Sequence, residues 1–187
     1  MGIPGDQEEP RVPLLTQDDL PEDYQYLFDE DVMGELHLFQ VMGHTPRAMQ
    51  AYMRFGTSLW NAGDLSTRER ELAILAVARQ QRAIYEWHQH VSMGLDAGIS
   101  YEELRSIAAD DYCGFPVREQ AIMRYAKAVA NESVTAPLFE AAVEVTDIET
   151  VVGLTLLAGH YLLTARFLDA MQIPTDEPFV GWQPEEA

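Results

Sequence analysis

Residues 67–98 constrain the fold most, because their pattern fits helix and little else. Residues 72–78 are all Leu, Ala, Ile or Val, and an aromatic and histidine-rich segment follows them. Ser66 with Glu69 three residues later matches a capping box, and Gly98 suits the position just after a helix end. We therefore expect two consecutive helices here, the first of them buried on nearly all sides.

The remaining chain also predicts helices. Nothing in it shows the sustained two-residue alternation of a half-buried strand. The expected helices span 21–30, 36–42, 46–61, 67–81, 84–97, 101–108, 117–130, 137–145 and 148–171. We predict an all-α fold with an extended arm (1–20), one helical domain (21–173) and a C-terminal tail (174–187).

The chain is strongly acidic, with 31 acidic and 12 basic residues and a net charge of −19. Phosphate binding requires the opposite sign, so we expect no nucleic-acid partner. Only one residue, Lys127, is a lysine, which favours a halophilic protein over an ordinary acidic one. At ~1 M salt the screening length is about 3 Å, and like charges on a surface hardly interact. In either case we expect the negative charge to reflect the solvent in which the protein works, and it gives no information about the reaction.

The compartment is predicted from what the sequence lacks. No apolar run reaches the roughly 18 to 20 residues that span a bilayer. The first residues lack the basic and apolar regions of a secretion signal. A single cysteine, Cys113, fits a reducing compartment, and the acids next to it disfavour a thiolate. We expect a cytoplasmic protein without a membrane partner.

Glu86 and His90 are the first candidates for chemistry. They lie four residues apart, so a helix would place them about 40° from each other on one face. A carboxylate so placed can orient and polarise an imidazole. His88 would point to the opposite side, so the two histidines could not bind one metal ion, and we expect no metal site. The alternatives are a surface pair and a histidine of the core.

Glu71 is the second acid, at the start of the apolar helix. The helix dipole favours a carboxylate there, and a neighbour such as Arg68 could simply neutralise it. If the two helices pack side by side, Glu71 could instead share a cavity with Glu86 and His90. We adopt this second interpretation as our hypothesis.

His160 lies alone on an apolar helix. Gly159 beside it would permit close approach of another backbone or of a ligand. A core histidine and a pocket-lining histidine are both compatible with this pattern. His37 and His44 have no partner pattern and are expected to be structural.

Several of these segments together resemble the carboxymuconolactone decarboxylase family, whose superfamily includes alkylhydroperoxidase D. The resemblance rests on Leu65-Ser66, residues 68–72 (Arg-Glu-Arg-Glu-Leu), residues 85–90 (Tyr-Glu-Trp-His-Gln-His) and Gly98-Ile99-Ser100. It implies an alkylhydroperoxidase D-like helical bundle that assembles as a homo-oligomer, a trimer or a hexamer.

The peroxidase branch of that superfamily carries Cys-x-x-Cys-x-x-x-His with a glutamate upstream. Here Ala83 and Glu86 stand at the two cysteine positions, whereas Glu71 and His90 are retained. The chain therefore resembles the decarboxylase-like branch. Antioxidant peroxidase activity is kept as an alternative, and a non-catalytic oligomeric binding protein as another.

The decarboxylase reaction, as the resemblance implies it, releases carbon dioxide from a carboxylated lactone and moves a proton. It needs a general acid or base and a site for anionic oxygens, without metal or organic cofactor. His90 would shuttle the proton. Glu86 would orient His90 or bind the substrate, and Glu71 would complete the proton relay. Tyr85 and His160 would bind the small-molecule substrate, and Arg54 or Arg166 could offset its charge.

Overall fold

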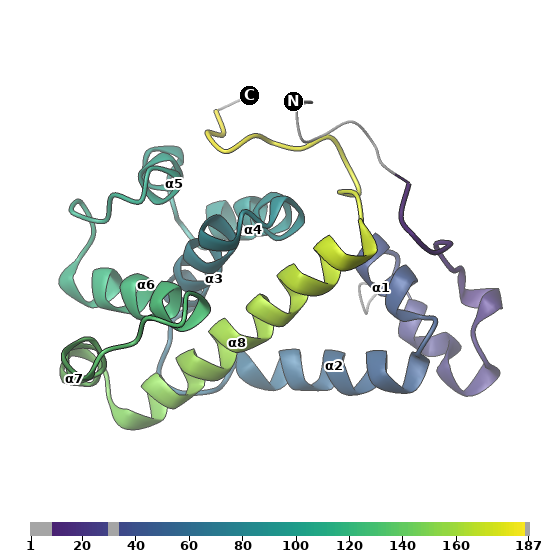
Figure 1. The fold of residues 1–187 in the computed structure, drawn as a ribbon, viewed down its shortest axis with the longest axis horizontal. Helices are drawn as coiled ribbons and strands as arrows, with labels where there is room; N and C mark the ends of the chain where they lie inside the picture. The colour runs from purple at the N-terminus through teal and green to yellow at the C-terminus, as the bar shows by residue number, and fades with distance from the viewer. Residues whose placement is uncertain (1–8, 30–33, 186–187) are drawn as a thin grey trace.

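The computed structural model of the chain describes residues 9–29 and 34–185, and within them all regular structure is helical (Figure 1). In chain order the elements are the 3-10 helices η1 (Gln17–Asp19) and η2 (Glu22–Phe28), followed by α1 (His37–Met42), α2 (Pro46–Leu59), α3 (Thr67–Gln81), α4 (Ile84–Asp96), α5 (Tyr101–Ala108), α6 (Val117–Ala130), α7 (Ala136–Val145) and α8 (Ile148–Met171). The all-α prediction is confirmed.

Most predicted helices lie within two residues of their expected ends, because their caps are encoded locally. The Ser66 hydroxyl accepts a hydrogen bond from the backbone N–H of Glu69 at 3.2 Å, and the Glu69 carboxylate accepts one from the backbone N–H of Ser66 at 2.9 Å. A helix was expected over 21–30. Residue 30 lies outside the described residues, and Glu22–Phe28 form the 3-10 helix η2 instead of an α-helix. Such a short segment gains little from α-helical bonds, and 3-10 turns are common in pieces of this length.

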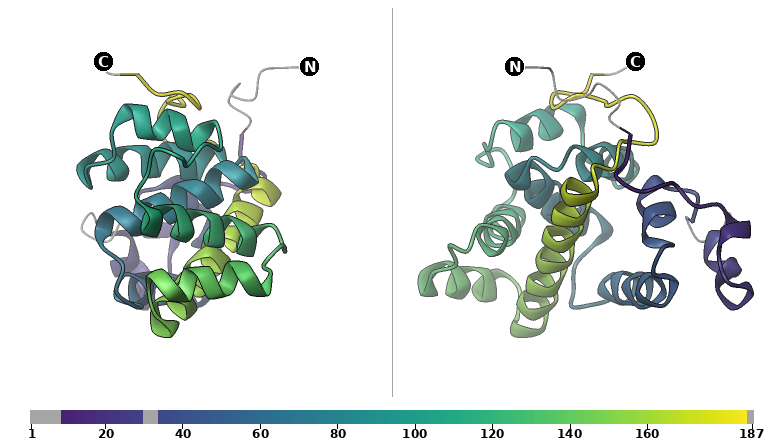
Figure 2. Two further views of the ribbon diagram at one scale, coloured as in Figure 1. Left: turned by 90° about the vertical axis from the view of Figure 1, so that its left-hand side faces the viewer. Right: turned by 45° about the vertical axis from the view of Figure 1, so that its right-hand side comes forward.

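Helix α3 lies at the centre and packs against α4, α5, α6 and α8. All seven residues from 72 to 78 are at most 1% exposed, as expected from the apolar run. Figure 2 (right) shows α8 standing between α3–α7 on one side and α1, α2 and the N-terminal turns on the other. The helices that carry the candidate residues therefore meet near the middle of the molecule.

Helix α8 is the longest element and runs diagonally across Figure 1. Contrary to the sequence-based expectation, its length and mean hydropathy of 1.5 would allow it to cross a membrane. Half of this apolar segment is buried inside the protein, which is typical of the core helix of a globular domain.

An ionic brace holds the N-terminal end of α3. The Arg68 guanidinium donates to Glu119 of α6 at 2.9 Å and to the Gly98 carbonyl at 2.7 Å, and it also pairs with Glu103 of α5. One cation thus ties three helices together beside the first turn of α3. Breaking such a partly buried network leaves carboxylates without a partner.

The C-terminal tail crosses the outer side of α4. The Asp176 carboxylate accepts hydrogen bonds from the His37 backbone N–H at 2.7 Å, the Tyr85 hydroxyl at 2.5 Å and the Gln89 amide at 2.7 Å. Further on, the Trp87 indole N–H donates to the Gly181 carbonyl at 3.0 Å. These contacts fix the first half of α4 from outside.

Helix α8 approaches the loop after α2 so closely that only glycine fits. A Cβ at Gly153 would lie 2.2 Å from the Ala62 carbonyl oxygen. Gly63, at φ +86°, meets the backbone of Thr150 in the same region. A Cβ at Gly159, two turns further along α8, would meet nothing within 4 Å.

This contrast gives a matched pair of substitutions. Gly153→Ala should lower the free energy of unfolding by at least about 2 kcal/mol, because α8 must move away from the loop. Gly159→Ala should raise it by about 0.5–1 kcal/mol, because alanine has a higher helix propensity than glycine and the added methyl group meets no other atom here. Urea denaturation followed by circular dichroism measures both. Equal stability of the two variants would contradict the close contact.

Candidate active site

Glu71 of α3 and His90 of α4 form a buried hydrogen-bonded pair. Glu71 Oε2 lies 2.7 Å from His90 Nδ1, and the two residues are 1% and 8% exposed. With a carboxylate as its partner, Nδ1 is the donor, so the proton-free nitrogen of a neutral ring is Nε2. Among the described residues Nε2 has no hydrogen-bond partner and is available to accept a proton.

Arg70 flanks this pair. Its Nε lies 3.6 Å from Glu71 Oε1, and its guanidinium sits 5.1 Å from the centre of the Trp60 ring. The charge of Glu71 is therefore offset by Arg70, which is its immediate neighbour in the chain. Arg68, the neutralising partner considered from the sequence, pairs instead with Glu103 and Glu119.

Glu86 lies one turn before His90 on α4 and is 3% exposed. Neither of its carboxylate oxygens has a hydrogen-bond partner among the described residues. Burial raises the pKa of Glu86 well above its usual range, and the nearby Thr164 hydroxyl acts in the opposite direction with a smaller effect. The Thr164 hydroxyl already donates to the His160 carbonyl at 2.9 Å. Glu86 was expected either to orient His90 or to bind substrate. In the structure the hydrogen bond that orients His90 comes from Glu71.

Helix α8 supplies aromatic neighbours. The Tyr161 ring meets the His90 ring edge-to-face at 5.0 Å and the His160 ring at 5.4 Å. Burial raises the pKa of Tyr161 well above its usual range, and the negative charge of Glu71 adds to this effect. Its hydroxyl is therefore a neutral group beside both acids.

His160 is enclosed between α8 and α2. The Tyr52 ring stacks on it at 4.5 Å, and burial lowers the pKa of His160 to about 4, so the ring is neutral near pH 7. The glycine that permits this approach is Gly56, where a Cβ would lie 3.1 Å from His160 Nε2. Gly159, expected for this purpose, faces open space instead.

The structure thus brings together Glu71, Glu86 and His90 with three residues of α2 and α8, and we call this set the acid–imidazole cluster: Glu71, Glu86, His90, Tyr52, His160 and Tyr161. Sequence analysis missed Tyr52 and Tyr161. Tyr161 stands next to His160 on an apolar helix, a signal that could have indicated it. Tyr52 reaches the cluster only through the packing of α2 on α8.

Other expected residues lie elsewhere. The Tyr85 hydroxyl is bound to Asp176 of the tail, so Tyr85 serves to anchor the tail. His88 accepts the Val180 N–H at 3.3 Å, away from His90 as expected. Arg54 is exposed, and Arg166 is exposed and donates to Gln81, so neither offsets charge at the cluster.

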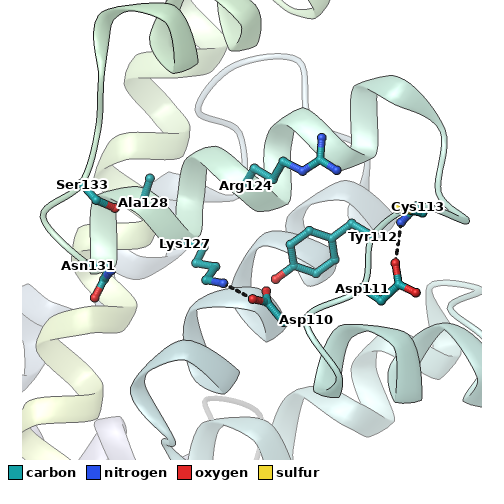
Figure 3. Close-up of a pocket in the computed structure, with 9 residues that line it drawn as sticks. All are labelled: Asp110, Asp111, Tyr112, Cys113, Arg124, Lys127, Ala128, Asn131 and Ser133. Atoms are coloured by element: carbon teal, nitrogen blue, oxygen red, sulfur yellow. Dashed lines mark hydrogen bonds and ion pairs between the residues drawn. The ribbon is translucent and has the colours of Figure 1, made fainter.

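Cys113 lines a different site. It borders a surface depression of about 330 Å³ between the loop after α5 and the C-terminal half of α6 (Figure 3). Lys127 pairs there with Asp110, and the Cys113 N–H donates to Asp111 at 3.0 Å. None of the residues that line this depression belongs to the acid–imidazole cluster. The thiol is therefore separate from the buried acids.

The cluster can supply both halves of an acid–base reaction. His90 Nε2 can accept a proton while Glu71 stabilises the imidazolium that forms. Glu86, kept protonated by burial, can donate a hydrogen bond or a proton. Two carboxyl groups whose surroundings differ so strongly are typical of an acid and a base with separate roles.

Glu86→Gln tests the protonation of this carboxyl. The raised pKa means that stability is full below the usual value of 4.5 and is lost as pH rises towards the folded-state pKa. Glutamine does not ionise, so the unfolding free energy of the variant relative to wild type should grow by up to about 1.4 kcal/mol per pH unit above pH ~5. Urea denaturation across this range measures it, and a constant difference would contradict a neutral Glu86.

Comparison with solved structures identifies the fold. A peroxidase-related protein from Ralstonia eutropha, described as an alkylhydroperoxidase AhpD core, is 21% identical with a TM-score of 0.79, over 96% of this chain and 100% of that one. A protein of unknown function from Agrobacterium tumefaciens is 16% identical with a TM-score of 0.66, over 73% and 96%. A cysteine-to-alanine variant of the debrominase Bmp8, in complex with 2,3,4-tribromopyrrole, is 13% identical with a TM-score of 0.73, over 90% and 94%.

No curated protein matches this chain. A family description does match its central part, which contains α2 to α6 almost completely and so includes Glu71, Glu86 and His90. On an AhpD-like helical fold, residues 46–128 of this chain thus match the carboxymuconolactone decarboxylase family.

Proposed function

We propose that this protein is a carboxymuconolactone decarboxylase-like enzyme that performs cofactor-free acid–base chemistry on a small carboxylated or lactone substrate. The observation that carries the proposal is the buried Glu71–His90 hydrogen bond of 2.7 Å beside a second acid, Glu86, without a hydrogen-bond partner. A buried polar group left unpaired costs stability, so its retention favours a functional reason.

In this proposal His90 moves the proton. Its Nε2 takes a proton from, or returns one to, a carbon next to a carbonyl group, and Glu71 holds the ring in position. Glu86 donates to the oxygen on which negative charge develops. Decarboxylation and simple proton transfer both use these groups, because each passes through an enolate.

The antioxidant alternative draws support from the AhpD-like fold alone. A thiol peroxidase needs an activated thiolate, and Cys113 lies beside acidic residues in a separate surface depression. The non-catalytic alternative predicts a filled, water-free core around Glu71 with Glu86 and His90 on the outside. Glu71 is 1% exposed, as this alternative requires, but Glu86 and His90 are also less than 10% exposed. Acid–base catalysis remains the function that the geometry supports best.

We also propose that the protein associates with further copies of itself through α8. Four apolar side chains of this helix are exposed along one face: Ile148, Val152, Leu156 and Leu163. An apolar stripe on a chain of net charge −19 is best covered by a surface of the same kind. Salt should favour this association, because it screens the repulsion between acidic copies.

Loss of turnover in His90→Gln tests the catalytic proposal. With carboxymuconolactone as substrate we expect kcat to fall by about 10²–10⁴-fold, the usual contribution of a positioned acid or base. His88→Gln, on the opposite side of the same helix, should leave the rate unchanged. Equal steady-state rates in wild type and His90→Gln would reject the proton-transfer role of His90.

Leu156→Glu tests the proposed association. It should lower the molar mass measured by light scattering to that of a single chain. Ser92→Glu adds the same charge at an exposed position of α4, outside the apolar face of α8, and should leave the mass unchanged. A wild-type protein that is monomeric at both low and high salt would refute the interface.

A further inference from the structure

Tyr52 and His160 lie in the acid–imidazole cluster, but the proposed proton transfer does not use them. They form the centre of a set of rings, since Phe55 meets His160 at 5.5 Å and Tyr161 meets it at 5.4 Å. Tyr161 in turn meets His90. The rings therefore form a continuous series from Phe55, which is 42% exposed, to the imidazole of the proposed base.

We call the rings of Tyr52, Phe55, His160 and Tyr161 the aromatic wall, and specific contacts hold it in place. The Tyr52 hydroxyl bonds to the Thr164 hydroxyl, which donates to the His160 carbonyl at 2.9 Å. Gly56 leaves just enough room for the His160 ring against α2. Rings fixed in this way lose little conformational entropy when a ligand packs against them.

The charges near the wall already balance. Arg70 offsets Glu71 across 3.6 Å, and burial keeps His160 neutral with a pKa of about 4. Glu86 is neutral for the same reason, because burial raises its pKa. Arg70 Nε has no hydrogen-bond partner among the described residues, but the charge of Arg70 is already balanced by that of Glu71. A ligand carboxylate would therefore bring a net negative charge into a buried site. Burial of an unpaired charge is strongly unfavourable.

We propose that the Tyr52–His160 stack binds the ring of an uncharged carbonyl compound without a free carboxylate. This compound is a lactone or cyclic ketone with one carbon between its carbonyl group and its double bond, and its carbonyl oxygen accepts a hydrogen bond from Glu86. This inference rests on the proposed acid–base function and narrows its substrate class from carboxylated or lactone compounds to uncharged ones. Carboxymuconolactone would then be bound more weakly than a neutral lactone. It assigns to Tyr52 and His160 the selection of the substrate ring.

The reaction on such a substrate is an isomerisation. His90 Nε2 takes a proton from the carbon between the carbonyl group and the double bond, and the electrons of that C–H bond form a dienolate. Its oxygen is stabilised by the Glu86 hydrogen bond. His90 then returns the proton to the far carbon of the original double bond, so the double bond moves into conjugation. Substrate and product have the same atoms, and no other reactant is consumed.

A matched pair of ligands tests the inference. One is α-angelica lactone, and the other is its analogue in which a carboxymethyl group replaces the methyl group. Dissociation constants are measured by calorimetry on wild type and on His90→Gln, where binding is separated from turnover. We expect the neutral lactone to bind at least about ten-fold more tightly than the carboxylated one.

Variants of the wall locate the binding site. Tyr52→Leu, which removes the ring, should weaken binding of the neutral lactone by about ten-fold, whereas Tyr52→Phe should weaken it far less. Should Tyr52→Leu fail to fold, Phe55→Ala removes a more exposed ring of the same series. The comparison of the two ligands on wild type requires no variant.

Uptake of solvent deuterium into the lactone, followed by NMR, reports on the chemistry separately. Selective binding of the neutral lactone with His90-dependent exchange supports both proposals. The same binding without exchange supports the substrate class and overturns the acid–base function. Tighter or equal binding of the carboxylated ligand, or unchanged binding in both Tyr52→Leu and Phe55→Ala, overturns the substrate class even if exchange occurs.

Discussion

The interior of this protein must accommodate two carboxyl groups where α3, α4 and α8 meet, and the two are accommodated differently. Glu71 keeps a hydrogen bond to His90 and a nearby cation in Arg70. Glu86 has neither, and burial raises its pKa so that it holds its proton. The rest of the fold maintains this difference, since water reaching Glu86 would remove the effect of burial.

Two sets of contacts at the edge of the molecule keep this junction closed. Arg68 ties the start of α3 to α5 and α6, and Gly153 lets α8 lie directly on the loop after α2. Neither touches the acid–imidazole cluster in the contacts described above. Both nevertheless determine how closely α3 and α8 approach, and hence how dry the space between them is.

The helices and the grouping of Glu71, Glu86 and His90 could be predicted, because caps and four-residue spacing are local signals. The acid that bonds to His90 could not be predicted, because it depends on how α3 packs against α4. Spacing favoured Glu86 on the same helix, yet the partner lies on the neighbouring one. The glycine beside His160 was misassigned for the same reason, because Gly56 approaches through space and not along the chain.

The tail gives α4 an unusual dependence on the end of the chain. The Asp176 carboxylate accepts hydrogen bonds from the start of α1 and from the first turns of α4. The Trp87 indole of α4 also donates to the Gly181 carbonyl. Glu86 and His90 lie on this same stretch of helix. Proteolytic trimming ahead of residue 176 would therefore loosen the proposed catalytic helix from its outer side, while the central packing around α3 stayed intact.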